Sequence, residues 1–302
     1  MLIGARFQRI ENTKQAESYQ KFDFLNINGG THYHPDFHPI VREWVKTKPI
    51  RFNNLLNPDK SSLLNGVQPE YALLKPALNM ALSCDKHAVS PFTINVFNEI
   101  LRDTGEFRFN NLNLDSLIRG FTLVKEQFPD VSLGFSDYRL FMRSNAKFES
   151  YYRLIERVNS QAIEGFYTGS LVGSFSMQIW RYVNDLQIKR DIFLKSLANS
   201  LRTFADMGIK THISECAIFV NQHRHYERKP SLTLRIAEQA EYYTEIMDVC
   251  RSNGCESFCF WQPFDANQET LRAFQKQSPI DNTGIFDMNY DLKSKLYLKY
   301  LK

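Results

Sequence analysis

Two glutamate residues, Glu99 and Glu215, each end a short run of apolar and β-branched residues ("INVFNE" and "KTHISE"). Neither belongs to the charge pattern of a helix face. Two carboxyl groups at one edge of a sheet are the minimum for cleaving a glycosidic bond, because one protonates the leaving oxygen while the other, ionised, attacks the anomeric carbon. Different surroundings keep their two pKa values apart. The alternative is that both glutamates form structural ion pairs with neighbouring lysine or arginine residues.

Another apolar run ends with an aromatic residue, Trp261, next to Gln262. A tryptophan ring packs well against the apolar C–H face of a pyranose, which makes Trp261 a candidate sugar platform; the alternative is an ordinary core residue. Asp265, four residues further on, is a candidate anchor for a loop or for a sugar hydroxyl.

Histidine and cysteine residues cluster without the spacing of a metal site. The gaps in "THYHPDFH" (31–38) suit neither one helix face nor a closed zinc site, so a surface loop is expected; "NQHRHYERK" (221–229) predicts a loop at the sheet edge. The cluster "CRSNGCESFC" lacks paired CxxC spacing and predicts small buried residues, with a Cys250–Cys255 disulfide as the alternative in an exported protein. No GxSxG motif supports a Ser-His-Asp triad. Neither a metal nor an organic cofactor is therefore expected.

The chain has 302 residues, of which 43% are hydrophobic and 14% aromatic, and a formal net charge of +4. This length can bury a sizeable core, and the interspersed basic residues form no tract for nucleic acid. No apolar stretch approaches the roughly 20 residues that cross a bilayer. The N-terminal sequence lacks signal-peptide features, so we expect a cytoplasmic protein, or a secreted one if a signal has been removed ahead of Met1.

Apolar β-rich runs alternate with amphipathic helical stretches, which predicts a parallel sheet. The expected strands are 2–7, 49–56, 92–99, 131–141, 162–169, 209–219 and 256–264. The expected helices are 36–47, 69–83, 114–128, 148–160, 187–206, 233–252 and 292–301. Strand runs that are apolar on both faces, such as "FTINVF", indicate a sheet buried on both sides.

Polar residues gather at the carboxyl ends of these strands, at Asn98-Glu99, Ser136-Asp137-Tyr138, Thr168, Ser214-Glu215 and Trp261-Gln262. In a (β/α)8 barrel those ends form one rim, where active sites are built. The alternative, an open nucleotide-binding sheet, is disfavoured because no glycine-rich phosphate loop follows an early strand. We therefore predict the α/β class and a single (β/α)8 TIM-barrel domain over residues 1–302.

The segment "INVFNEILRDTGEFR" resembles the acid/base strand of glycoside hydrolase family 10, the (β/α)8 endo-β-1,4-xylanases, with Asn98 and Glu99 on its Asn-Glu pair. "MGIKTHISECAIFV" is similar to the family's nucleophile strand and places Glu215 on the nucleophile. "QAEYYTEIMDVCRSNGCESFCFWQPF" resembles the last helix and strand, including Trp261 and a Cys250/Cys255 pair where many members carry a disulfide. The resemblance is strongest over residues 69–302.

This resemblance implies a retaining β-glycosidase that cleaves a polysaccharide or oligosaccharide, xylan-like or bacterial, without a cofactor. Glu99 would be the acid/base, Glu215 the nucleophile, Asn98 a contact of the sugar 2-hydroxyl and Trp261 the stacking platform. Further substrate contacts that it implies are Asp137 and Tyr138 in "SLGFSDYRLF", Gln262, and Asn12 and Lys14 in "IENTKQAESYQKFDF".

The sequence also departs from the family pattern. "PIRFNNLLNPDK" (49–60) takes the place of a strand with His and Trp but contains neither, and the position of the histidine that contacts the nucleophile falls near Leu171. The second tryptophan after Asp265 is missing, and one N-terminal strand is expected to be short, irregular or absent. These groups line the sugar subsite at the scissile bond, so their loss removes contacts worth on the order of a kcal/mol each. The alternative functions are a catalytically inactive carbohydrate-binding barrel and, more weakly, a barrel hydrolase of another bond type.

Overall fold

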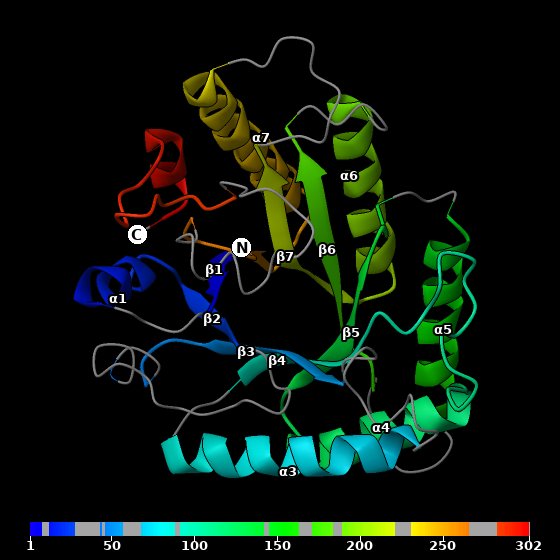
Figure 1. Ribbon diagram of the computed structural model, residues 1–302. Helices are drawn as coiled ribbons and strands as arrows, with labels where there is room; N and C mark the ends of the chain where they lie inside the picture. Colours follow the sequence, from blue (N-terminus) through cyan, green and yellow to red (C-terminus); the bar gives the residue numbers. More distant parts are fainter. Residues whose placement is uncertain are drawn as a thin grey trace.

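The computed structural model describes residues 1–7, 12–27, 43, 46–56, 68–87, 91–141, 145–162, 171–183, 189–220, 231–265 and 283–301. Eight parallel strands form a closed barrel in sequence order, because β1 pairs with both β2 and β8 (Figure 1). The strands are β1 (Leu2–Arg6), β2 (Phe24–Ile27), β3 (Ile50–Leu56), β4 (Pro91–Asn98), β5 (Ser132–Tyr138), β6 (Ser174–Tyr182), β7 (Lys210–Phe219) and β8 (Ser257–Phe260). The predicted (β/α)8 barrel is confirmed.

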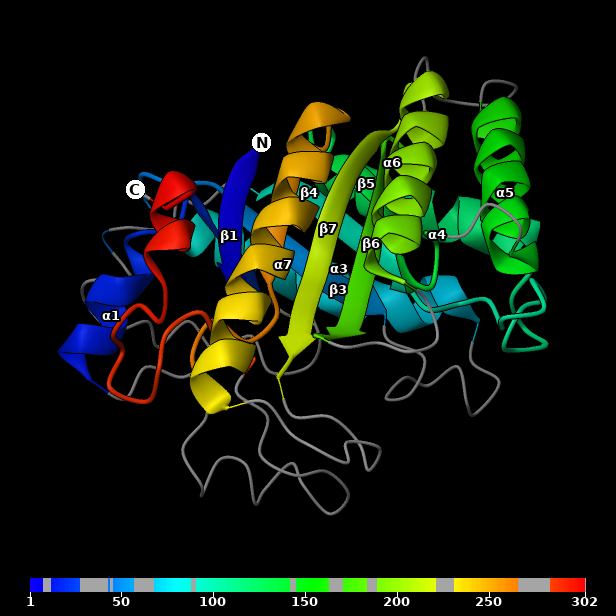
Figure 2. The same ribbon diagram turned by 90° about the horizontal axis from the view of Figure 1, so that it is seen from above.

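Helices on the outside of the barrel return the chain between parallel strands (Figures 1 and 2). They are α1 (Thr13–Tyr19), α3 (Pro69–His87), α4 (Leu114–Gln127), α5 (Ala146–Ala162), α6 (Arg190–Asp206) and α7 (Leu232–Ser252), followed by the 3-10 helix η3 (Lys295–Lys299). Figure 2 shows the arrowheads of β6 and β7 at the same end of the barrel. The carboxyl ends of the strands therefore gather into one rim. None of the helices in the described ranges is long and apolar enough to cross a membrane.

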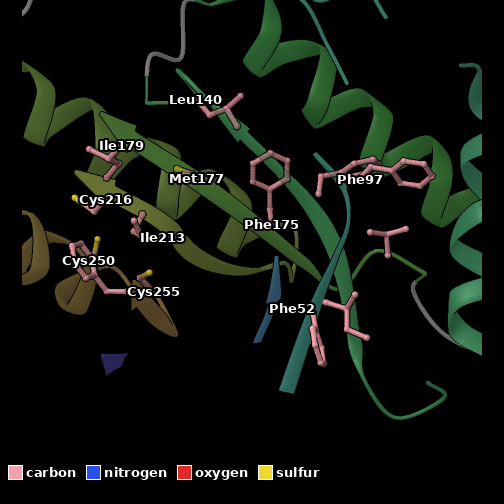
Figure 3. Packing of buried hydrophobic residues seen from close by; sticks show 14 of the residues in the cluster. Phe52, Phe97, Leu140, Phe175, Met177, Ile179, Ile213, Cys216, Cys250 and Cys255 are labelled. Atoms are coloured by element: carbon pink, nitrogen blue, oxygen red, sulfur yellow. The ribbon is translucent and has the colours of Figure 1, made fainter. Parts of the chain in front are cut away.

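Local sequence explains how the outer layer forms, as α4 shows. Asn113 and Ser116 make a reciprocal capping box at its start. The ring of Phe121 lies 5.2 Å from Phe97 on β4 and 4.9 Å from Phe135 on β5. Figure 3 shows Phe97 and other apolar side chains of the strands packed in this buried layer. Aromatic packing under the helices thus fixes β4 and β5, the strands that carry one side of the rim.

The interior of the barrel is polar, whereas branched apolar side chains are usual there. Hydrogen bonds join strands that are not neighbours, and such bonds must cross the interior: Thr93 on β4 to Ser174 on β6, Ser136 on β5 to Ser214 on β7, and Arg51 on β3 to Ser257 on β8. All of these side chains are buried. The interior is therefore a layered hydrogen-bond network that leads up to the rim.

Several predicted elements differ from the structure. The expected strand 162–169 does not describe the sixth strand, which is β6 at Ser174–Tyr182; Ala162 ends α5, and 163–169 lie outside the described residues. The short strand β2, of four residues, was not predicted at its position, although one short N-terminal strand was expected. The final helix is only the 3-10 turn η3, and most of the expected helix 36–47 lies outside the described residues.

Candidate active site

Strand β4 brings Asn98 and Glu99 to the rim. The strand ends at the buried Asn98, and Glu99 follows with a φ of 49°, a left-handed conformation that non-glycine residues seldom adopt. The Glu99 amide donates to the Ser136 carbonyl at 2.8 Å, so the contact with β5 continues past the end of the strand. The Glu99 side chain is 22% exposed, and its carboxyl group is thus accessible to solvent.

The segment after β4 folds back and places Arg108 beside Glu99. The Arg108 amide donates to the Ile100 carbonyl at 2.9 Å. Its guanidinium Nη2 lies 3.6 Å from Glu99 Oε2 and donates to the Tyr138 hydroxyl at 2.8 Å. Glu99 therefore has the cationic neighbour that the ion-pair alternative anticipated, and it also has an exposed carboxyl group.

Glu215 reaches the barrel interior through a β-bulge in β7. Met177 pairs with Ile213 and the next residue, Gln178, pairs with Glu215, so Ser214 is the extra residue. A bulge lets two consecutive side chains share one face of a strand. Ser214 bonds to Ser136 across the interior, and Glu215 Oε1 accepts a 3.0 Å hydrogen bond from Asn53 Nδ2 on β3.

Burial dominates the electrostatics of Glu215, which is only 5% exposed. Loss of solvent raises its pKa to about 8, and the negative charge of Glu99 acts in the same direction. The positive charges of Arg6 and Arg51 and the hydrogen bond from Asn53 oppose this rise. The two carboxyl groups thus occupy contrasting environments, one partly exposed and one buried, within electrostatic reach of each other.

A glutamine that the sequence analysis missed joins the two glutamate strands. Gln178 on β6 pairs in register with Glu215 and donates to Asn98 Oδ1 at 2.9 Å. It was overlooked because the sixth strand was expected at 162–169. For the same reason the position beside the nucleophile was misplaced near Leu171, a buried residue before β6; the β6 sequence "SFSMQIWRY" contains no histidine.

Aromatic side chains gather at the β6–β8 side of the rim. Trp261 follows β8, and its ring lies 5.5 Å from that of Trp180, which is 43% exposed and also contacts Phe219. The guanidinium carbon of Arg6 lies 3.7 Å from the centroid of the Trp261 ring. Trp180 was not singled out from the sequence, although a tryptophan near a strand end is the same signal that identified Trp261.

Asp137 and Tyr138 lie behind Glu99, at the end of β5. Asp137 is fully buried; its carboxylate contacts Lys147 Nζ at 2.6 Å and accepts hydrogen bonds from the Tyr151 hydroxyl at 2.5 Å and the Tyr138 amide at 2.7 Å. Burial raises the pKa of Asp137 to about 6, against the effect of Lys147. Asp137 is thus shielded from a direct contact with substrate by its burial, whereas Tyr138 is partly exposed.

The remaining predicted contacts hold other parts of the chain. Gln262 accepts a 2.7 Å hydrogen bond from Thr283. Asp265, the candidate loop anchor, accepts the Gly284 amide at 2.9 Å and contacts Lys293 at 3.2 Å. Asn12 caps α1, and Lys14 pairs with Asp291 on the surface at 2.8 Å. In the described residues, therefore, Asn12 and Lys14 are engaged at the start of α1 and not with the two glutamates.

The described ranges contain no cluster of three or more His, Cys, Asp or Glu side chains that could hold a metal ion. The histidine segments 31–38 and 221–229 lie outside them. All five cysteines are buried free thiols, as the small-core-residue interpretation predicted; Figure 3 shows Cys250 and Cys255 among the buried apolar side chains.

Comparisons with known proteins find similarity in sequence and in fold. The family model for glycosyl hydrolase family 10 matches residues 85–299. Xylanase 10B from Thermotoga petrophila RKU-1 in complex with xylobiose is 18% identical, with a TM-score of 0.72 over 96% of this chain and 90% of that one. An endo-1,4-beta-xylanase from Caldicellulosiruptor owensensis is 19% identical, with a TM-score of 0.74 over 96% and 93% of the two chains. No curated protein sequence matches the chain.

Proposed function

Since the chain belongs to glycosyl hydrolase family 10, and is thus an O-glycosyl hydrolase of the endo-1,4-β-xylanase-like type, we propose that it cleaves a xylan-like β-linked polysaccharide or oligosaccharide with retention of configuration. The observation that carries the proposal is the pair of carboxyl groups of Glu99, directly after β4, and Glu215, at the bulge of β7, joined through Asn98, Gln178 and the β6–β7 pairing. Solved relatives of the same fold are xylanases, one of them bound to xylobiose.

In this reaction Glu99 donates its proton to the glycosidic oxygen while the Glu215 carboxylate attacks the anomeric carbon. The bond from that carbon to the leaving oxygen breaks, and a glycosyl ester of Glu215 forms. Glu99, now ionised, removes a proton from an incoming water, whose oxygen attacks the anomeric carbon and releases Glu215 as carboxylate. Two inversions give net retention. In this proposal Asn98 contacts the sugar 2-hydroxyl, and the rings of Trp180 and Trp261 stack on sugar units.

The test is hydrolysis of xylan and aryl β-xylobiosides, with the first-formed product anomer followed by proton NMR. We expect the β-anomer to appear first. Glu99→Gln and Glu215→Gln should lower turnover by at least two to four orders of magnitude while glycan binding persists. Azide should rescue Glu99→Ala and give a β-glycosyl azide, because azide needs no general base.

Two outcomes would contradict the proposal. An α-anomer as first product would assign an inverting reaction and different roles to both glutamates. Binding of xylo-oligosaccharides by the wild-type protein without any turnover would identify a catalytically inactive carbohydrate-binding barrel.

A further inference from the structure

The end of β1 places an arginine next to β8, the strand that lies between β1 and the Glu215 strand β7. Ala5 pairs with Phe260 of β8, so Arg6 and Trp261 are the next residues of the two neighbouring strands. The Arg6 guanidinium packs on the Trp261 ring at 3.7 Å. The Trp261 amide in turn donates to the carbonyl of Cys216, the residue after Glu215, at 3.0 Å. Trp261 thus connects the two strands: its ring holds the Arg6 guanidinium, and its amide bonds to the backbone of β7 next to the bulge.

The other described groups around Glu215 are mostly neutral. Asn53 on β3 and Gln178 on β6 are amides, and Cys259 on β8 is a thiol whose pKa burial raises to about 12, which leaves it uncharged at neutral pH. The charged groups are Glu99 on β4, which opposes ionisation of Glu215, and Arg6 and Arg51, which favour it. The two arginines, together with the hydrogen bond from Asn53, therefore offset part of the effect of lost solvent on Glu215.

Of the two arginines, Arg51 lies deeper. It is fully buried on β3 and donates to the hydroxyls of Ser176 and Ser257. A substitution of Arg51 would remove the hydrogen bonds to these buried hydroxyls and leave a cavity. The effect of the lost charge on Glu215 could then not be separated from the effect of the lost packing. Arg6 is only partly buried and lies at the rim, where its charge can be changed with less effect on the core.

We propose that Arg6 is a positioning residue for the nucleophile: its guanidinium, held on the Trp261 ring, supplies a positive charge that favours the carboxylate form of Glu215 in a site shielded from water. An opposite charge in the neighbourhood of an acid favours its ionised form, and arginine stays protonated throughout the working pH range. The inference rests on the proposed function, since that assigns attack on the anomeric carbon to Glu215.

The direct test is an NMR titration without substrate. Protein labelled with 13C at the glutamate carboxyl carbons is titrated, and the Glu215 signal is assigned by its loss in Glu215→Gln. In Arg6→Gln the Glu215 midpoint should move up by about one pH unit or more. Arg6→Lys should stay near wild type. Arg190→Gln, which removes an arginine packed on Tyr242 at 4.7 Å on the barrel exterior, is the matched control and should leave the Glu215 midpoint unchanged. An unchanged Glu215 midpoint in Arg6→Gln would overturn the proposal.

A second measurement separates charge from folding within one variant. The five native cysteines are buried, so a thiol introduced by Arg6→Cys is the reactive one. Modification with an aminoethyl thiosulfonate restores a positive charge at position 6, and a neutral methyl thiosulfonate does not. The cationic adduct should titrate at lower pH than the neutral one; equal midpoints would contradict the proposal.

The same variants distinguish this inference from the proposed function. If the wild-type protein cleaves glycans but Glu215 titrates alike in all variants, the function stands and the role of Arg6 falls. If no glycan is cleaved although the titration shifts as expected, the charge partnership stands and the function falls. Where both hold, kcat/KM on an aryl glycoside whose leaving group departs without protonation should have an acidic limb that shifts upward in Arg6→Gln by the same amount as the NMR midpoint.

Discussion

At the scale of single residues, Glu215 combines burial with a role that uses its ionised form. Loss of solvent raises its pKa to about 8, whereas Arg6, Asn53 and Arg51 act to lower it. A dry carboxylate is a strong nucleophile because little solvent has to be removed before it attacks. The balance between burial and the two arginines therefore sets the pH at which Glu215 becomes ionised.

This balance predicts an alkaline-shifted pH profile. On an aryl β-xylobioside whose leaving group departs without protonation, the free enzyme needs only Glu215 to be ionised, so kcat/KM should rise as pH increases through about 8. Measurement of kcat/KM on an aryl β-xylobioside from pH 5 to pH 10 checks this. An acidic limb near pH 4 would show that Glu215 is far better solvated or paired than the structure indicates.

Trp180 gives a second prediction at this scale. It is 43% exposed and lies 5.5 Å from Trp261, so its ring is available for stacking on a sugar. Trp180→Ala should raise the Kd for xylo-oligosaccharides roughly 3- to 10-fold, because an aromatic contact of this kind contributes about 1 kcal/mol. Tyr71→Ala, which removes an exposed aromatic residue from α3, is the matched control. Equal Kd values for the wild type and Trp180→Ala, determined by calorimetry, would exclude Trp180 from the binding surface.

At the scale of elements, the buried pair of Asp137 and Lys147 connects β5 to α5. Their charged atoms lie 2.6 Å apart, and both side chains are fully buried. Lys147 Nζ also lies 3.5 Å above the Tyr138 ring, and Tyr138 holds Arg108 beside Glu99. The pair therefore supports the side of the rim that carries Glu99.

Lys147→Met should destabilise the protein by about 3–5 kcal/mol at pH 8, because it leaves the Asp137 charge buried without its partner. The pKa of Asp137, already raised to about 6, would rise further in the variant. At pH 5 protonation removes the uncompensated charge, so the loss of stability should be smaller there than at pH 8. Urea unfolding at both pH values tests this; a loss that is equal at the two pH values would rule out an electrostatic origin.

The elements also show what sequence reasoning could and could not reach. Long amphipathic helices such as α4 and apolar strands such as β4 have strong periodicity, and both were predicted nearly to their ends. Strand β6 was missed because an apolar run shortly before it competed for the same place, and Gln178 was lost with it. Arg6 could not be found because its place depends on the pairing of β1 with β8, and Asn53 because its role depends on a hydrogen bond across the barrel interior to Glu215. No local sequence pattern encodes either contact.

At the scale of the whole molecule, barrel closure brings residues from both ends of the chain together. Leu2 pairs with Ser257 and Ala5 with Phe260, so the first strand completes the wall on which Trp261 and Arg6 lie. The polar interior is a consequence of the site it supports: Asn53, Asn95 and Ser176 form consecutive hydrogen bonds across the barrel below Glu215. Such a network specifies one arrangement, because a break in it leaves buried polar atoms unsatisfied.

The burial of Glu215 should cost the whole molecule stability, and this cost should depend on pH. Its pKa is about 8 in the folded protein and 4.5 in the unfolded chain. The unfolded state thus releases its proton first as pH rises, and stability present below pH 4.5 is lost progressively up to about pH 8. The loss at pH 7 is on the order of 3 kcal/mol.

Glu215→Gln, which does not titrate and can still accept a hydrogen bond from Asn53, tests this. Its melting temperature should lie several degrees above that of the wild type at pH 7 and should equal it at pH 4. Glu256→Gln, a matched change at a half-exposed ion pair with Lys210, should have little effect at either pH. If Glu215→Gln fails to stabilise the protein at pH 7, the Glu215 carboxyl group is solvated and its position in the barrel does not lower the stability of the fold.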